Sequence, residues 1–232
     1  EKVKKFMSDV DEQLWKLGIT AKTQHNEVAP CQHEIAPIFS VSNVALDNNY
    51  LVMNVLKKTA KKYGLVCLLH EKPFDGINGS GKHNNWSLTT DDGINLFKPG
   101  KEPENNKVFQ LVLACLMSAV DKHAVLLRTA ASNTGNDHRL GANEAPPAII
   151  SIYLGDQVGD VVDQIIKNGK ATSSLHSGVI DFGINKLPVL EKDPTDRNRT
   201  SPFAFTGNRF EFRMVASSNS IGDTNTVLSA MM

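Results

Sequence analysis

Apolar residues recur at spacings of three and four along much of the chain, which is the period of a helix with one buried face. Four helices are predicted on this basis, at residues 5–17, 51–63, 105–127 and 157–168. Gly18, Gly64 and Gly169 directly follow three of them. Glycine readily adopts the left-handed conformation that closes a helix, so these positions support the predicted ends.

Two of the predicted helices carry stripes of apolar residues that we expect to face a core. In the helix at 105–127 the expected buried residues are Val108, Val112, Cys115, Ala119 and Leu126. In the helix at 157–168 they are Val158, Val161, Val162, Ile165 and Ile166.

Short strands are predicted between the helices. The apolar run Leu65-Val66-Cys67-Leu68-Leu69 predicts a buried strand over residues 65–70. In the stretch Arg209–Arg213 the alternation places two arginines and Glu211 on one face and two phenylalanines on the other. Helices and strands alternate irregularly, which favours an α+β fold over a doubly wound sheet.

Composition and charge narrow the class of protein. The 232 residues carry 25 basic and 25 acidic side chains, which leaves no electrostatic footprint for nucleic acid or an anionic membrane. Uninterrupted apolar runs fall short of the roughly 20 residues that a spanning helix needs. The three cysteines lack CxxC spacing, so we expect reduced thiols in a cytoplasmic protein, two of them buried.

The stretch GINGSGKHNNWSL at residues 76–88 concentrates glycines with polar side chains. Its first seven positions match the phosphate-loop pattern GxxxxGK[ST], but His83 stands where Ser or Thr should contact magnesium, and no helical pattern follows. We therefore reject a Walker loop. Two readings remain: a polar turn, or a site where His83 ligates a metal and Asn78-Gly79 approach a small polar substrate.

Two glutamates lie in the extended stretch NEVAPCQHEIAPIF at residues 26–39. Glutamates in strands usually face solvent, but Glu34 sits in apolar sequence, and a buried carboxylate must be paired or bind a metal. Glu27 and Glu34 are seven residues apart, so strict alternation puts them on opposite faces. A bulge at Pro30-Cys31 would have to shift the phase if both face one site.

Arginines mark two further candidate sites. Arg139 and Glu144 lie in a predicted loop over residues 131–148, of a length typical of lids. The planar guanidinium group suits a carboxylate or phosphate ligand, although a surface salt bridge would explain the same residues. Arg197 and Arg199 lie upstream of the Arg209–Arg213 strand, whose polar face could line a cavity or simply water.

Taken together, EVAPCQHE, NGSGKH, RLGANEAP and NRFEFR resemble, in this order and spacing, the signature series of glutamine synthetase. HEKPF, NGSGKHNNWSL and DRNRTSPFAFTGN resemble its type III class, and the resemblance extends from Lys22 to about Leu228. It implies an α+β catalytic domain with a curved antiparallel sheet, a half-barrel, backed by helices. It also implies that residues 1–232 are an internal part of that domain, without the N-terminal domain and without the strand bearing the first metal ligands.

The resemblance implies a set of metal ligands. Glu27 and Glu34 would hold one divalent cation, while His83 and Glu211 would hold a second that faces the ATP phosphates. Oxygen ligands with one imidazole suit Mg²⁺ or Mn²⁺, with two or more ions per site.

It also implies residues for the amino acid. Asn78 and Gly79 would bind glutamate, and Arg139 and Arg213 its carboxylates. Glu144 would lie on a flap over the γ-glutamyl intermediate and take a proton from ammonium. The partners implied are glutamate, ammonia and ATP, in a homo-oligomer of stacked rings with active sites at subunit boundaries.

For the nucleotide, the resemblance implies that Arg199 and Arg209 neutralise the transferring phosphoryl group and that Asn85 contacts ATP. Arg199 thus joins Arg139 and Glu144 as a residue expected to act in catalysis. Other classes carry a further arginine between the positions of Arg199 and Arg209, where this chain reads Pro202-Phe203-Ala204-Phe205. Two alternatives stay open: a related γ-glutamyl ligase that uses an amine, and a non-catalytic scaffold of the same fold.

Overall fold

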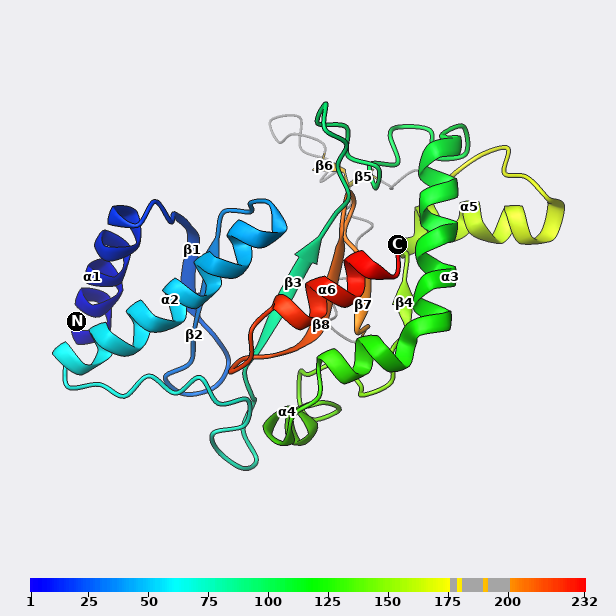
Figure 1. Cartoon of the computed structure of the whole chain (residues 1–232). Coiled ribbons are helices and arrows are strands. Elements are labelled where there is room, and N and C mark those ends of the chain that lie inside the picture. Colours follow the sequence, from blue (N-terminus) through cyan, green and yellow to red (C-terminus); the bar gives the residue numbers. More distant parts are fainter. Residues whose placement is uncertain (176–178, 181–189, 192–200) are drawn as a thin grey trace. The chain divides into compact units, whose positions relative to one another are not determined.

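The computed structural model describes residues 1–175, 179–180, 190–191 and 201–232 (Figure 1). The described chain divides into two compact units, which are treated separately below. Unit 1 comprises Glu1–Lys82, Ala130–Ala145 and Val215–Ser229. Unit 2 comprises His83–Thr129, Pro146–Met214 and Ala230–Met232.

Helices and strands are mixed, as the α+β prediction requires. The helices are α1 (Lys2–Lys16), α2 (Ser42–Lys62), α3 (Lys107–Ala130), α4 (Thr134–Arg139), α5 (Gly155–Asn168) and α6 (Gly222–Ala230). The strands are β1 (Ala21–Asn26), β2 (His33–Pro37), β3 (Gly81–Trp86), β4 (Ile152–Tyr153), β5 (Val179–Ile180), β6 (Leu190–Glu191), β7 (Phe203–Phe205) and β8 (Phe210–Ala216). The sheets that they form in the described chain are unclosed, which is consistent with a half-barrel.

The four predicted helices correspond to α1, α2, α3 and α5. Gly18, Gly64 and Gly169 follow α1, α2 and α5 with φ values of 75°, 59° and 73°, which confirms the predicted left-handed ends. The helix α2 begins at Ser42, well before the predicted start, because apolar periodicity marks only the part that packs.

In unit 1, α1 and α2 enclose a small hydrophobic core beside the hairpin β1–β2. The buried residues of this core are Val10, Leu14, Ile19, Val52 and Val55. The strands β1 and β2 are antiparallel, and His25 lies opposite Glu34 in the register. The core of the two helices thus anchors a hairpin that carries acidic side chains.

In unit 2, the strand order β3-β8-β7-β4 forms the main sheet. The pair β7–β8 is antiparallel, with Phe205 opposite Phe210, while β4 joins β7 in parallel. Both phenylalanines of the predicted alternation, Phe210 and Phe212, are fully buried and pack with Phe203 and Phe97. Aromatic pairs of this kind contribute about 0.5–1.5 kcal/mol beyond their area burial. This aromatic core fixes the strand from which Glu211 projects.

Of the apolar stripe predicted for α3, only Ala119 is buried, and the rest of the prediction was wrong. The buried residues of α3 are Phe109, Leu113, Leu116, Ala119, Val120 and Leu127. Val108, Cys115 and Leu126 are exposed, since the helix presents a face rotated by about one residue from the predicted one. Both stripes have the same 3.6-residue period, so apolar spacing could not decide between them.

Uninterrupted apolar runs in α3 are short, as expected, but the helix as a whole is long and apolar. By length and composition alone, α3 could cross a membrane. Buried core helices of soluble proteins have the same property. The charged residues Asp121 and Lys122 interrupt the apolar sequence of the helix just before its kink at His123. The absence of a membrane partner stays a prediction.

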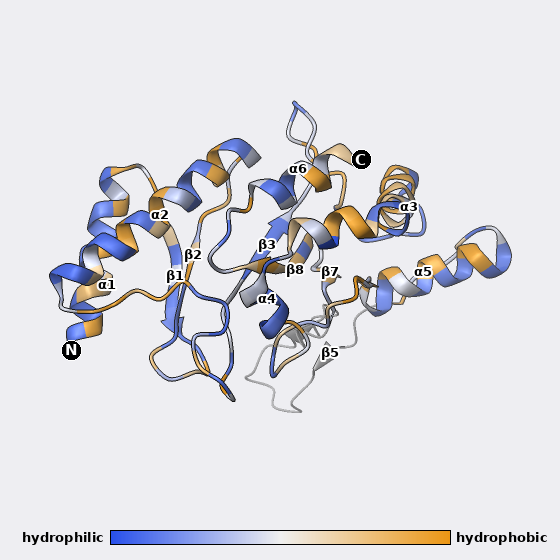
Figure 2. Cartoon of the chain, turned by 60° about the horizontal axis from the view of Figure 1, so that its bottom comes forward, coloured by the Kyte–Doolittle hydropathy of each residue, from blue (hydrophilic) through white to orange (hydrophobic). Residues whose placement is uncertain are grey.

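Three smaller predictions about burial also fail. Residues 65–70 form no strand, and Val66 and Leu68 are exposed, so the apolar run is not buried along its length. Cys31 and Cys115 are exposed and only Cys67 is half-buried. On α5, Val158 and Val161 are buried as predicted, but Ile166 is exposed. Figure 2 shows apolar and polar residues alternating around this helix. In each case the sequence pattern identified apolar residues but could not show which of them pack against other parts of the protein.

Candidate active site

A hairpin, rather than a bulged strand, brings the two glutamates of residues 26–39 together. After β1 the chain turns through residues 27–32, where the Glu27 amide donates to the carbonyl of Gln32 at 2.9 Å. Cys31 adopts a left-handed conformation in the turn, with φ of 57°. Consequently Glu34 on β2 returns opposite His25 on β1. The predicted phase shift within one strand is therefore replaced by a reversal of the chain.

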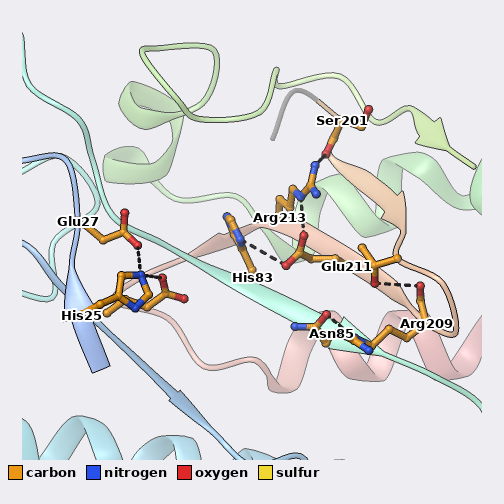
Figure 3. Close-up of polar contacts among 10 residues, drawn as sticks. His25, Glu27, His83, Asn85, Ser201, Arg209, Glu211 and Arg213 are labelled. Atoms are coloured by element: carbon orange, nitrogen blue, oxygen red, sulfur yellow. Dashed lines mark hydrogen bonds and ion pairs between the residues drawn. The ribbon is translucent and has the colours of Figure 1, made fainter. Parts of the chain in front are cut away.

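The two glutamates flank one imidazole. His25 Nε2 lies 3.0 Å from Glu27 Oε1 and 3.1 Å from Glu34 Oε2 (Figure 3). One ligand atom from each residue lies within 4.8 Å of the other two. The Glu27 side chain is largely buried at 15% exposure, whereas that of Glu34 is 40% exposed. Two carboxylates and an imidazole at this spacing fit a divalent cation that prefers oxygen ligands.

The glycine-rich stretch lies against Arg139 in unit 1. A Cβ atom on Gly81 would fall only 2.0 Å from the guanidinium group of Arg139, and one on Gly79 would fall 3.2 Å from its Cγ. Glycine at this position lets the guanidinium group approach the backbone, and a Cβ atom would displace it. At Gly81 strand β3 begins rather than a helix, which confirms that the stretch is not a Walker loop.

Arg139 is buried rather than displayed on an open lid. It ends the short helix α4, an element that the loop prediction missed, and Asn133 caps this helix by accepting from the amide of Asn136 at 2.7 Å. Only 4% of Arg139 is exposed, and its Nη1 donates to Asn136 Oδ1 at 2.9 Å. Burial lowers the pKa of Arg139 to about 10, while the charge of Glu71 opposes that shift.

Gln32 connects the hairpin turn to the glycine-rich stretch within unit 1. Its Nε2 donates to the carbonyl of Gly79 and to Ser80 Oγ, both at 2.9 Å. The backbone that carries Asn78 and Gly79 is therefore held by a side chain from the turn beside Glu27 and Glu34.

In unit 2 the predicted pair His83 and Glu211 meets. His83 Nδ1 on β3 lies 3.5 Å from Glu211 Oε1 on β8, and Arg213 Nε donates to Glu211 Oε2 at 2.7 Å (Figure 3). The Arg213 side chain is 2% exposed, and its Nη1 also donates to the carbonyl of Ser201 at 3.3 Å. Burial alone would raise the pKa of Glu211, but His83 and Arg213 together lower it to about 2. Glu211 is therefore a carboxylate at neutral pH.

The predicted nucleotide residues Asn85 and Arg209 also lie together. Arg209 Nε donates to Asn85 Oδ1 at 3.0 Å, and both side chains are exposed (Figure 3). Arg209 Nη1 donates to Asn208 Oδ1 at 2.9 Å. An exposed guanidinium group beside an amide can bind phosphate oxygens. Arg199 and Arg197 lie outside the described residues.

Two other predicted features have different surroundings. Glu144 is exposed in the turn after α4, next to Asn143 with its left-handed φ of 51°. The stretch Phe203–Phe205, which replaces the arginine of other classes, forms the fully buried strand β7. Phe203 and Phe205 therefore form part of the aromatic core. A guanidinium group could not occupy these positions without a buried partner.

Sequence reasoning found most of these side chains but missed His25, Gln32 and Glu71. His25 stands two residues before Glu27, the spacing at which side chains of an extended segment point to the same side, so the sequence carried a signal for it. The metal residues fall into two groups, one in each unit: Glu27 and Glu34 with His25, and His83 with Glu211. Their convergence on one cavity stays a prediction.

Comparison with known proteins identifies the family. Residues 1–151 match the family described as glutamine synthetase, catalytic domain. The chain is 54% identical over 226 residues to the type-3 glutamine synthetase of Dictyostelium discoideum, covering 97% of this chain and 31% of that protein. It is 50% identical over 234 residues to a glutamine synthetase of Bacteroides fragilis, covering 100% of this chain and 32% of the relative. The chain thus spans about a third of the length of these relatives.

Solved structures show the same fold at low identity. A structure titled "Apo GmaS without ligand" superposes with a TM-score of 0.68 at 17% identity, over 97% of this chain and 43% of that one. A Plasmodium falciparum glutamine synthetase superposes with a TM-score of 0.64 at 18% identity, over 97% of this chain and 37% of that one. The resemblance seen in the sequence motifs is confirmed: this chain belongs to the glutamine synthetase family.

Proposed function

We propose that the full-length protein joins ammonia to the γ-carboxylate of glutamate at the expense of ATP, giving glutamine, ADP and phosphate. The observation that carries this proposal is the group His83, Glu211 and Arg213, in which a largely buried carboxylate lies within 3.5 Å of two nitrogen side chains on strands β3 and β8. Family membership supports the same reaction.

The donor atoms suit the cations that such a reaction uses. His25, Glu27 and Glu34 would hold one Mg²⁺ or Mn²⁺ ion, and His83 with Glu211 a second, with carboxylate oxygen as the main ligand type. When bound, such ions offset the negative charge of the phosphates and carboxylates. Each group includes one largely buried carboxylate, Glu27 in the first and Glu211 in the second, for which a cation is a suitable partner.

The first chemical step brings several anions together. An oxygen of the glutamate γ-carboxylate attacks the γ-phosphorus of ATP, the bond to the bridging oxygen breaks, and ADP leaves. We assign Arg209 and Arg199 to the phosphoryl oxygens and Asn85 to the nucleotide, since the exposed Arg209–Asn85 pair can accept an anionic ligand. Arg139, Asn78 and Gly79 would position the amino acid, together with Arg213.

The second step requires neutral ammonia. Ammonium loses a proton to the carboxylate of Glu144, the nitrogen lone pair attacks the γ-acyl carbon, and inorganic phosphate leaves with its bonding electrons. The exposed position of Glu144 on the turn after α4 leaves it accessible to an incoming cation. A base at this point is needed because ammonium has no lone pair to donate.

Assembly and location are also part of the proposal. We expect a cytoplasmic homo-oligomer of stacked rings with active sites at subunit boundaries, and further metal ligands from regions of the longer protein. The chain of residues 1–232 by itself should therefore form no glutamine, and detectable synthesis by it would contradict the need for those regions.

The test is glutamine synthesis by the full-length protein with ATP, Mg²⁺ and ammonia, together with manganese-dependent γ-glutamyl transfer to hydroxylamine. We expect wild type to be active in both assays and His83→Ala to lose at least about 100-fold, the typical effect of removing a group that stabilises transition-state charge. Equal activity of both would remove His83 from the site. Preference for methylamine over ammonia would favour an amine ligase, and complete inactivity would favour a scaffold.

A further inference from the structure

A carboxylate outside the predicted site occupies the centre of unit 1. Glu71 follows the apolar run at 65–69 and is only 2% exposed. Its Oε1 accepts from the amide of Ser218 at 2.9 Å, from the Ser218 hydroxyl, and from Asn133 Nδ2 at 3.3 Å. Three segments that are distant in sequence are thus joined at one side chain.

The backbone of Glu71 supports the glycine-rich stretch. Its carbonyl accepts from the amide of Ser80 at 2.7 Å, and a Cβ atom on Gly79 would fall 2.3 Å from the same oxygen. A Cβ atom on Gly135 in α4 would likewise fall 2.5 Å from Glu71 Oε2. Because Gly79 and Gly135 have no Cβ atom, Glu71 can approach closely both the glycine-rich stretch and the helix that carries Arg139.

Glu71 also supplies negative charge where unit 1 buries positive charge. The guanidinium group of Arg139 is 4% exposed and lies on Gly81. A buried cation is costly unless an anion is near, and Glu71 is the carboxylate whose charge acts on Arg139. Burial raises the pKa of Glu71, but the hydrogen bonds from Ser218 and Asn133 outweigh it and leave the pKa below its ordinary value.

We propose that Glu71 is a positioning residue for the amino-acid substrate: its buried charge and its backbone carbonyl hold Arg139 and the stretch Asn78–Gly81 in the arrangement that receives the substrate carboxylate. This inference rests on the proposed function, since it assigns Arg139 and Asn78 to glutamate. Glu71 touches no reacting atom and acts through Arg139 and the glycine-rich backbone.

The test compares Glu71→Gln with Glu71→Asp in the full-length protein. Gln keeps the size and an acceptor oxygen but removes the charge, whereas Asp keeps the charge and shortens the side chain. If Glu71 acts through charge, Gln should raise the KM for glutamate about tenfold and Asp about threefold, with the KM for ATP changed less than about twofold. A purely structural role predicts the reverse order, because Asp loses the hydrogen bonds that Gln retains.

Two further variants complete the design. Gly135→Ala, whose Cβ would displace the carboxylate, should raise the KM for glutamate in the same direction even if Glu71→Gln fails to fold. Glu12→Gln, an exposed carboxamide substitution on α1, is the matched control and should leave both KM values unchanged. An unchanged KM for glutamate in Glu71→Gln and Gly135→Ala, or equal rises for glutamate and ATP, would overturn the inference.

A binding measurement separates this inference from the proposed function. Glutamate is titrated into the full-length protein by calorimetry without ATP or ammonia. If wild type forms no glutamine, the proposed reaction fails, yet weaker glutamate binding by Glu71→Gln than by wild type would still support the positioning role. Active wild type with equal glutamate binding by both proteins would overturn the positioning role alone.

Discussion

The acidic group of the hairpin and that of the sheet use the same residue types in different surroundings. In the hairpin, His25 contacts both Glu27 and Glu34, and the side chains of His25 and Glu34 are 50% and 40% exposed. In the sheet, Glu211 is 17% exposed and is bonded by Arg213, which is almost fully buried. The hairpin group is thus accessible to a cation from solvent, while the sheet group carries a permanent positive partner.

The difference shows that the charge of a carboxylate depends on which nitrogen side chain contacts it. Burial raises the pKa of Glu211, but His83 and Arg213, which donates at 2.7 Å, lower it in the absence of any metal. In the hairpin the imidazole of His25 is charged only when protonated. We therefore expect the sheet group to matter most for stability and the hairpin group to matter most for cation affinity.

The largest expected effect is on stability. Glu211→Ala leaves the buried Arg213 without its carboxylate partner. We expect it to lower the free energy of unfolding of the full-length protein by about 3 kcal/mol, the lower end of the effect of removing one partner of a buried ion pair. Glu34→Ala, which removes a half-exposed carboxylate, should cost at most about 1 kcal/mol. Calorimetric unfolding without added metal measures both. Equal losses would abolish the distinction between the two groups.

For cation affinity we expect the hairpin group to matter more than the sheet group. Removing His25, which contacts both hairpin carboxylates, should weaken Mn²⁺ binding by about 10- to 100-fold, the usual effect of losing a ligand or a group that orients one. The measurement is a Mn²⁺ titration followed by electron paramagnetic resonance, with His33→Ala, an exposed imidazole on the same hairpin, as control. If His25→Ala and His33→Ala bind Mn²⁺ alike, the hairpin group is not a cation site.

A smaller effect, on the KM for glutamate, is expected from substitution in the glycine-rich stretch, outside both acidic groups. Gly81→Ala places a Cβ atom onto the guanidinium group of Arg139 and should raise the KM for glutamate about tenfold by displacing that group. Gly159→Ala in α5 meets no atom within 4 Å and serves as control, with an expected stabilisation of up to about 1 kcal/mol. A normal KM for glutamate in Gly81→Ala would show that Arg139 does not bind the substrate.

The smallest effect concerns pH and extends the comparison to Glu71, a carboxylate that is more deeply buried than those of either group. Its folded-state pKa lies below the ordinary value of 4.5, so the stabilisation is fully present above about pH 4.5 and is lost as the pH falls further. The difference in melting temperature between wild type and Glu71→Gln should therefore be constant from pH 6 to 8 and shrink in acid. A difference that grows in acid would contradict the depressed pKa.

The sequence predicted the secondary structure that has a strong local cause. The ends of α1, α2 and α5 follow from glycines that accept a left-handed conformation, and the burial of Phe210 and Phe212 follows from alternation in β8. The motifs also named most of the side chains that the structure brings together, such as Glu27 with Glu34 and His83 with Glu211. The stripe of α3 and the run at 65–70 were misjudged, because equal apolar periods allow more than one buried face.

By itself the sequence determined the family, the residue types of the candidate ligands and the polar face of the Arg209–Arg213 strand, all of which depend on residue identity and local geometry. Only the tertiary structure decided that a hairpin brings Glu34 back to His25, that Arg139 is buried on Gly81, and that Glu71 joins three segments. These contacts join residues up to 147 positions apart. Their existence depends on chain reversal and packing, which no local pattern of polar and apolar residues encodes.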